Sequence, residues 1–231
     1  DLHSFPTRRS SDLHIGVSYG ITTGFGAFAN KRISADQVRQ LQLNLVRSHA
    51  CGIGEPLAAP IVRRMLLLKA NSLAAGISGV RTELVDALLA MLNNDVLPVI
   101  PGRGSVGASG DLAPLAHMSL CLIGEGEATH DGRRLEGAEV CRAAGLEPIA
   151  LEAKEGLALI NGTQLSLALA LDGLFAAEAL LDASIVIGAL TVDGLAGSYA
   201  PFDARIHEAS RSPHQMEVAR RFLYGDRKSV V

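Results

Sequence analysis

The sequence lacks tryptophan altogether, and aromatic residues make up only 4% of its 231 residues. Hydrophobic residues nevertheless make up 48% of the chain, and most of them are Ala and Leu, which favour helices. A protein of this size can bury a substantial core, and here that core must be aliphatic because large rings are scarce. The composition therefore predicts a mainly α-helical protein.

The sequence also has no excess of positive charge. Lys and Arg number 21 against 24 Asp and Glu, which gives a net charge of −3. Without a basic surface, a nucleic acid is not an expected partner. Residues 1–13 contain no apolar run of the kind a secretory signal needs, and Asp1 and Asp12 argue against a transit peptide. We expect residues 1–13 to be a disordered tail outside the fold, and the protein to be cytoplasmic.

Cysteine is too scarce for a disulfide framework. Cys51, Cys121 and Cys141 are odd in number and show no CxxC spacing, so free, buried thiols in a reducing compartment are expected. The seven histidines show no HExxH spacing, so no metal site is expected. Cys51 and His49 could suggest a thiol nucleophile, but residues two apart on a helix do not face each other.

One apolar run, residues 165–190, is long enough to be mistaken for a membrane span. It contains Asp172, Glu178 and Asp182, each of which is costly in hydrocarbon. The run is better explained as a buried helix of a large bundle, and no membrane is an expected partner.

Caps, prolines and turn residues predict the order of the remaining elements. Ser34 and Thr82 are expected helix caps, and Asp131-Gly132 is typical of a two-residue hairpin turn. The expected helices cover residues 34–48, 60–75, 82–92 and 137–146. Residues 153–195 are expected to be helical for most of their length, followed by a helical stretch interrupted at Pro213. No repeat or linker divides the chain, so residues 14–224 are expected to form one domain.

The most informative segment is the glycine-rich stretch PGRGSVGASGD at residues 101–111, directly before an apolar helix. It lacks the GK[ST] ending of a phosphate-binding loop. Within it, Ala108-Ser109-Gly110 can condense if the loop turns tightly: the Gly110 nitrogen attacks the Ala108 carbonyl carbon and closes a five-membered ring. The ring then loses one water, and the Ser109 hydroxyl leaves as a second water. The product is a 4-methylidene-imidazol-5-one, an electron-poor alkene. Alone, an Ala-Ser-Gly triplet is most often an ordinary turn.

The longer run GSVGASGDLAPLAHMSL resembles the signature of the aromatic amino acid ammonia-lyase and aminomutase family, in which this ring is a protein-derived cofactor and no external one is needed. Further segments of the chain are similar to that family in order and spacing; they are YGITTGFG (19–26), LNLVRSHACGIGEPL (43–57), KEGLALINGTQLS (154–166) and PFDARIH (201–207). The resemblance implies a large helical bundle, related in architecture to the fumarases, with a small N-terminal region of loops and strands that carries the catalytic loop.

The resemblance spans about residues 14–222, whereas residues 225–231 do not match. Family subunits are longer and form homotetramers whose active sites draw on several subunits. The chain is therefore expected to be an N-terminal fragment, truncated at its C-terminus, and to be inactive without the remainder.

The resemblance also implies roles for residues outside the triplet. Tyr19 is the expected base that removes a β-proton of the substrate, although a phenol titrates near 10 and needs an environment that stabilises phenolate. Asn161 is expected to hold the substrate and the ring, with Gln164 nearby on the same helix face. Asp111 either assists ring formation or caps the helix that follows it.

The pair Ser48-His49 bears on the choice of substrate. It resembles the histidine-directed branch of the family, although a His near a helix C-terminus can also simply suit the helix dipole. A polar imidazole in the site could pair with the imidazole of L-histidine. The sequence therefore predicts elimination of ammonia from L-histidine to give urocanate. A tyrosine or phenylalanine lyase or aminomutase, and an inactive helical scaffold, stay open as alternatives.

Overall fold

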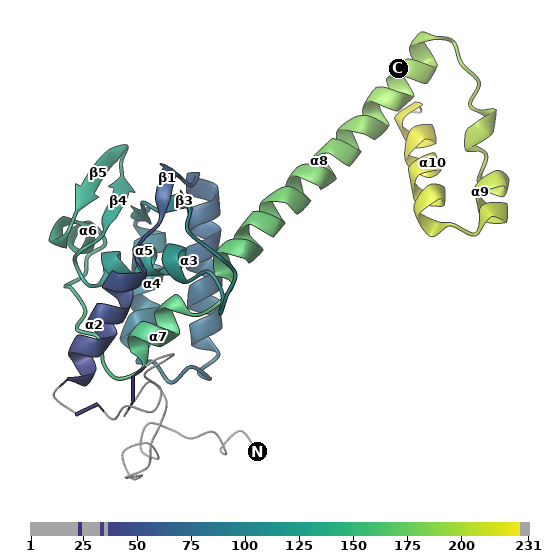
Figure 1. Ribbon diagram of the computed structural model, residues 1–231. Helices are drawn as coiled ribbons and strands as arrows, with labels where there is room; N and C mark the ends of the chain where they lie inside the picture. The colour runs from purple at the N-terminus through teal and green to yellow at the C-terminus, as the bar shows by residue number, and fades with distance from the viewer. Residues whose placement is uncertain (1–22, 25–32, 35–36, 227–231) are drawn as a thin grey trace. The chain divides into compact units, whose positions relative to one another are not determined.

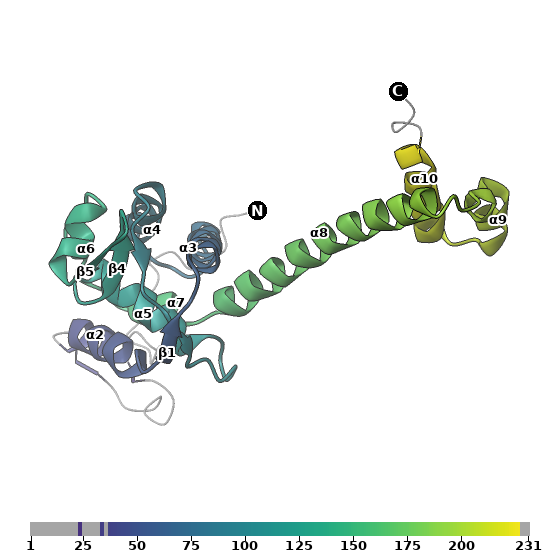
Figure 2. The same ribbon diagram turned by 90° about the horizontal axis from the view of Figure 1, so that it is seen from above.

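The computed structural model describes residues 23–24, 33–34 and 37–226. These residues divide into two compact units, the first ending at Ala170 and the second beginning at Leu171. The first unit is built around α5 (Leu112–Leu122), which contacts α2 (Val38–His49), α7 (Glu155–Ile160), α4 (Thr82–Asn93) and α6 (Ala138–Ala143) (Figures 1 and 2). Helix α3 (Ala59–Ala74) packs mainly against α4. The fold is mainly α, as the composition predicts.

Helix α5 is central because nearly all its faces are apolar. Leu115, Ala116, Met118 and Leu122 are each 0% exposed, and they join the side chains of the surrounding helices in one aliphatic core. A helix that is apolar all round can only be stable when it is covered on all sides. The N-terminus of α5, which follows the glycine-rich loop, is thereby fixed in the middle of the unit.

Two small antiparallel sheets complete the first unit. One pairs β1 (Ile53–Pro56) with β3 (Pro101–Arg103), so it ties the chain after α2 to the start of the glycine-rich loop. The other has the order β2 (Leu97–Pro98), β4 (Glu127–His130) and β5 (Arg133–Glu136). Asp131 and Gly132 join β4 to β5 with φ of 49° and 72°, which confirms the predicted hairpin turn.

The second unit contains most of α8 (Gln164–Gly194), then η2 (Ala200–Phe202), α9 (Ala204–Ser210) and α10 (Pro213–Asp226). The Phe222 ring stacks on Phe202 with centroids 4.6 Å apart, and Arg221 pairs with Asp182 of α8 at 2.7 Å. The predicted interruption at Pro213 is confirmed, since this residue begins α10.

Two expectations about helix caps are wrong. The first helix begins at Val38 after Gln37 rather than after Ser34, and Arg81, not Thr82, precedes α4. The stretch 153–195 is helical for most of its length, as predicted, but it does not form one helix, because it is interrupted between α7 and α8. At the break Asn161 is extended, with φ −90° and ψ 126°, and Gly162 has φ 144°. Such a conformation cannot continue a helix.

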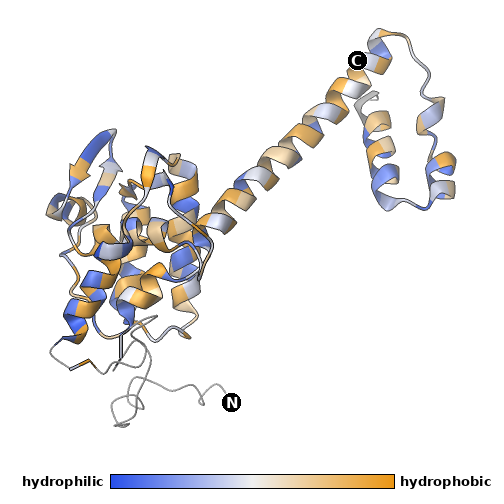
Figure 3. Cartoon of the chain, in the orientation of Figure 1, coloured by the Kyte–Doolittle hydropathy of each residue, from blue (hydrophilic) through white to orange (hydrophobic). Residues whose placement is uncertain are grey.

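The sequence predicts a buried helix of a large bundle at residues 165–190, and these residues are helical but mostly exposed in this chain. Among the described residues, α8 is the one helix long and apolar enough to cross a membrane, and only 6% of its most apolar window is buried. Figure 3 shows apolar residues along its length. Large side chains are exposed on several of its faces; they include Leu174, Phe175, Leu180, Leu181, Val186, Ile187 and Leu190.

Candidate active site

The glycine-rich loop makes its tightest turn at the Ala108-Ser109-Gly110 triplet. Ala108 and Ser109 are exposed, whereas Gly110 is buried. The Gly110 N–H donates to the Gly107 carbonyl at 3.4 Å, which closes the turn only weakly. Ser109 has φ 60°, in the left-handed region that a residue with a Cβ rarely adopts. The loop thus holds its serine in a strained, solvent-facing turn, of the kind that marks functional sites.

The segment after α7 lies directly against this turn. Gly110 and Gly162 form a parallel bridge, and the Asp111 N–H donates to the Gly162 carbonyl at 2.7 Å. A Cβ on Gly110, whose φ is 105°, would overlap the Gly162 carbonyl oxygen. Glycine is therefore required at residue 110, both for its conformation and for the close approach of the two backbones.

Asp111 anchors the turn through its side chain. It is 1% exposed, and its Oδ1 accepts hydrogen bonds from the Ser105 and Ser166 hydroxyls, each at 2.8 Å. Its Oδ2 accepts from the Ser166 backbone N–H, also at 2.8 Å. Asp111 does occupy the N-cap position of α5, but its carboxylate makes no capping bond to that helix. It satisfies an N–H in the first turn of α8 instead.

Asn161 and Gln164 do not share a helix face, contrary to the prediction. Asn161 follows the last residue of α7 and is exposed, whereas Gln164 is the first residue of α8. The Gln164 side chain lies over Gly162, and its buried Oε1 has no hydrogen-bond partner within the described part of the chain. Both residues remain next to the triplet, because Gly162 bridges Gly110.

His49 ends α2, and its Nδ1 lies 2.8 Å from the Leu45 carbonyl oxygen and 3.1 Å from the Ser48 Oγ. A ring nitrogen that faces a carbonyl carries the proton, so Nε2 of the neutral ring is left as an acceptor. The contact also fits the simpler interpretation, in which a His suits the C-terminus of its own helix.

A second histidine, His117 of α5, ties the chain after His49 to the site. Its Nε2 accepts the Gly52 N–H at 3.0 Å, and burial lowers the pKa of its imidazole, which favours this neutral, accepting form. A Cβ built on Gly104 would lie 3.0 Å from the Gly52 Cα, so this segment touches the start of the glycine-rich loop.

Lys69 of α3 is 1% exposed, and its Nζ donates to the Asn161 carbonyl oxygen at 2.9 Å. Burial lowers the pKa of this ammonium to about 8. Lys69 was not among the predicted site residues. A signal for it exists in the sequence, because Lys69 falls within an apolar stripe at helical spacing that contains Val62, Met65, Leu66 and Leu73. Ser105 and Ser166 were missed because their partner Asp111 lies 6 and 55 residues away.

Three other expectations concern the base Tyr19, the cysteines and a metal site. Tyr19 lies outside the described residues. Cys121 and Cys141 are free and buried, as expected, but Cys51 is exposed. In the described ranges no three His, Cys, Asp or Glu side chains group so that they could hold a metal ion.

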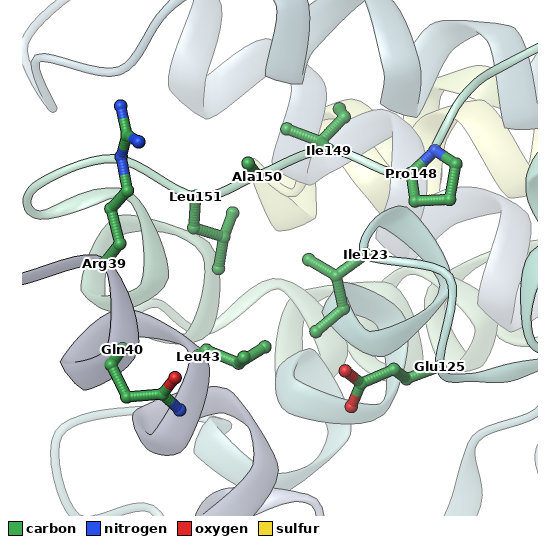
Figure 4. A pocket seen from close by; sticks show the side chains of 9 residues that line it. All are labelled: Arg39, Gln40, Leu43, Ile123, Glu125, Pro148, Ile149, Ala150 and Leu151. Carbon is green, nitrogen blue, oxygen red and sulfur yellow. The ribbon is translucent and has the colours of Figure 1, made fainter.

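A surface cavity of about 330 Å³ lies elsewhere on the first unit (Figure 4). Its charged side chains are already paired: Arg39 with Glu152 at 2.6 Å, and Glu125 with Arg47. The cavity shares no residue with the triplet, Asp111 or the Asn161–Gln164 segment; its lining is Arg39, Gln40, Leu43, Ile123, Glu125, Pro148, Ile149, Ala150 and Leu151. It offers no free acid, base or nucleophile, so the glycine-rich loop is the candidate site.

The model of the family "Aromatic amino acid lyase" matches residues 13–226, so the chain belongs to the aromatic amino acid lyase family.

Individual relatives narrow the comparison. The chain is 58% identical over 202 residues to histidine ammonia-lyase of Burkholderia pseudomallei (strain 668), which covers 87% of this chain and 40% of that protein. Among solved structures, histidine ammonia-lyase from Trypanosoma cruzi has a TM-score of 0.82 at 39% identity, over 89% of this chain and 40% of that one. Phenylalanine aminomutase of Pantoea agglomerans has a TM-score of 0.84 at 32% identity, over 93% of this chain and 41% of that one. The chain thus spans about two fifths of the length of these relatives.

Proposed function

We propose that this chain is the N-terminal part of a histidine ammonia-lyase that converts L-histidine to urocanate and ammonium. The observation that carries the proposal is the Ser109 turn, with its positive φ and its buried neighbour Gly110, in a chain 58% identical to a histidine ammonia-lyase. Residues 14–224 would form one domain of a cytoplasmic homotetramer, and α8 would pack in a helical bundle with parts of the protein outside this chain.

The residues of the triplet fit formation of the methylidene-imidazolone ring. The Gly110 nitrogen bonds to the Ala108 carbonyl carbon, and its proton passes to the Ala108 oxygen. That oxygen leaves as water with the Ser109 amide proton, and the Ser109 hydroxyl leaves as a second water with the Cα proton. The Gly110 N–H is available for this step because, among the described residues, it is held only by the weak 3.4 Å contact to the Gly107 carbonyl oxygen.

When formed, the ring supplies an electron-poor alkene that attracts the amino group of the substrate. Asp111, held by Ser105 and Ser166, keeps the Gly110–Asp111 peptide fixed while the ring closes. The α5 N-terminus, which begins one residue later, favours negative charge on the ring oxygen. In this proposal no external cofactor or metal is needed.

The remaining residues would act on the substrate. Tyr19 would remove the β-proton, and Asn161 would hold the substrate and the ring, with Gln164 beside it. His49 would present its free Nε2 to the substrate imidazole. A site that pairs polar groups discriminates strongly against side chains that lack them, so tyrosine and phenylalanine would be poor substrates.

The test is urocanate formation by a protein that has the full length of the relatives. Ser109→Ala is expected to lower kcat by more than about a thousandfold, as removal of a covalent catalytic group does. Ser72→Ala, an exposed serine on α3, is the matched control and should leave activity unchanged. Retained activity in Ser109→Ala contradicts the assigned electrophile. Faster release of coumarate or cinnamate than of urocanate, each followed by absorbance, identifies a tyrosine or phenylalanine enzyme instead.

A further inference from the structure

Lys69 is an unusual side chain for the interior of this protein. It lies in the core beside Met65 and Leu66, and burial alone lowers its pKa. No carboxylate within the described residues pairs with it, and its Nζ donates a hydrogen bond to the Asn161 carbonyl oxygen. A buried ammonium without an anion is costly, so it is retained only where its contact is needed.

That contact falls on the segment that lies against the triplet. Two successive carbonyls of this segment are held from different elements: Asn161 by Lys69 of α3, and Gly162 by the Asp111 N–H that follows the triplet. The segment itself has little intrinsic order, because it is the break between α7 and α8 and contains a glycine at φ 144°. Without an external anchor, Gly162 would be free to move away from Gly110.

We propose that Lys69 is a positioning residue, whose ammonium holds the Asn161–Gly162 segment against Gly110 and so keeps the triplet in its condensing turn. The charge matters because a charged donor forms a stronger hydrogen bond than a neutral one, and burial excludes the water that would compete for the carbonyl. An effect of Lys69 on ring formation rests on the proposed function, whereas its contact with the Asn161–Gly162 segment does not.

The direct readout is hydrogen exchange at the Asp111 amide, measured residue by residue on the chain. Lys69→Met keeps an unbranched side chain in the core and removes the donor. We expect Asp111 to exchange about tenfold faster in this variant, since its acceptor Gly162 is no longer held. Met65→Ala is the matched control: this buried α3 residue packs on the same face and should lower the thermal unfolding midpoint without selectively exposing Asp111.

An Asp111 amide as protected in Lys69→Met as in the wild type would overturn the proposal, and so would an equal loss of protection in Met65→Ala. Lys69→Leu, which also lacks a donor, is measured by the same criterion should Lys69→Met not fold. The mass of the triplet in the wild-type chain separates this result from the proposed function. If the triplet has its full encoded mass, with no water lost, the ring proposal fails. The exchange data still decide whether Lys69 anchors the segment.

Discussion

The two compact units of this chain differ in how far their apolar side chains are buried. In the first unit, α5 is covered by other helices, and Leu115 is 0% exposed. In the second, α8 leaves Leu180 71% exposed and Ile187 63% exposed. Burial of apolar surface is the main source of folding free energy, at roughly 25 cal/mol per Å². The first unit therefore contains its own stabilising core, whereas the second presents apolar surface that calls for further partners.

The polar contacts follow the same division. In the first unit the Glu155 carboxylate, 2% exposed, receives two hydrogen bonds from the Arg81 side chain, each 2.8 Å long, and one from its backbone N–H at 3.1 Å. In the second unit the pair between Arg221 and Asp182 is largely solvent-exposed. Buried and exposed ion pairs differ sharply in the cost of breaking them, so they test how much each unit depends on its own interior.

The largest difference is expected between Arg81→Ala and Arg221→Ala. Arg81→Ala leaves a buried carboxylate unpaired and should lower the free energy of unfolding by about 3–5 kcal/mol. Arg221→Ala removes an exposed pair and should cost less than about 1 kcal/mol. Urea denaturation followed by circular dichroism gives both values. Equal losses would contradict the contrast between the units.

Acid provides a control for the Arg81 result. Burial raises the pKa of Glu155, but hydrogen bonds from Arg81 and from the Glu152 N–H outweigh it, so the pKa lies below its ordinary value of 4.5. A lowered folded pKa contributes stability above 4.5 that is lost as the pH falls through the folded value. The wild type should lose this contribution on acidification, and Arg81→Ala should lose less. Parallel pH curves would show that the pair is not the cause.

A somewhat smaller contrast is expected for leucine truncation. Leu115→Ala creates a cavity in the core and should cost about 3–5 kcal/mol in the same denaturation experiment. Leu180→Ala removes an exposed side chain and should change stability by less than about 0.5 kcal/mol. A large cost at Leu180 in this chain would show that α8 already buries its apolar surface.

The sequence predicted what depends on local signals. Three predictions rest on signals that act within a few residues, and the structure confirms them. They are the apolar helix α5, the start of α3 near Pro60 and the Asp131-Gly132 turn. The triplet was found because its chemistry requires three consecutive residues.

Contacts between distant parts of the chain were beyond local patterns. The break after α7 was missed because Gly162 forms a bridge with Gly110, which lies 52 residues away in the sequence. The anchoring of Asp111 by Ser166 is equally non-local. The exposure of α8 depends on which packing partners the described residues supply, whereas hydropathy predicts only a need for burial.

The central claim is that Ala108-Ser109-Gly110 condenses, and the mass of the tryptic peptide 104–133 from the mature, active protein tests it most directly. Condensation predicts a peptide lighter than the encoded sequence by two waters, and Ser109→Ala should abolish the loss of the second. A peptide of full encoded mass, from protein that still deaminates histidine, would contradict the account.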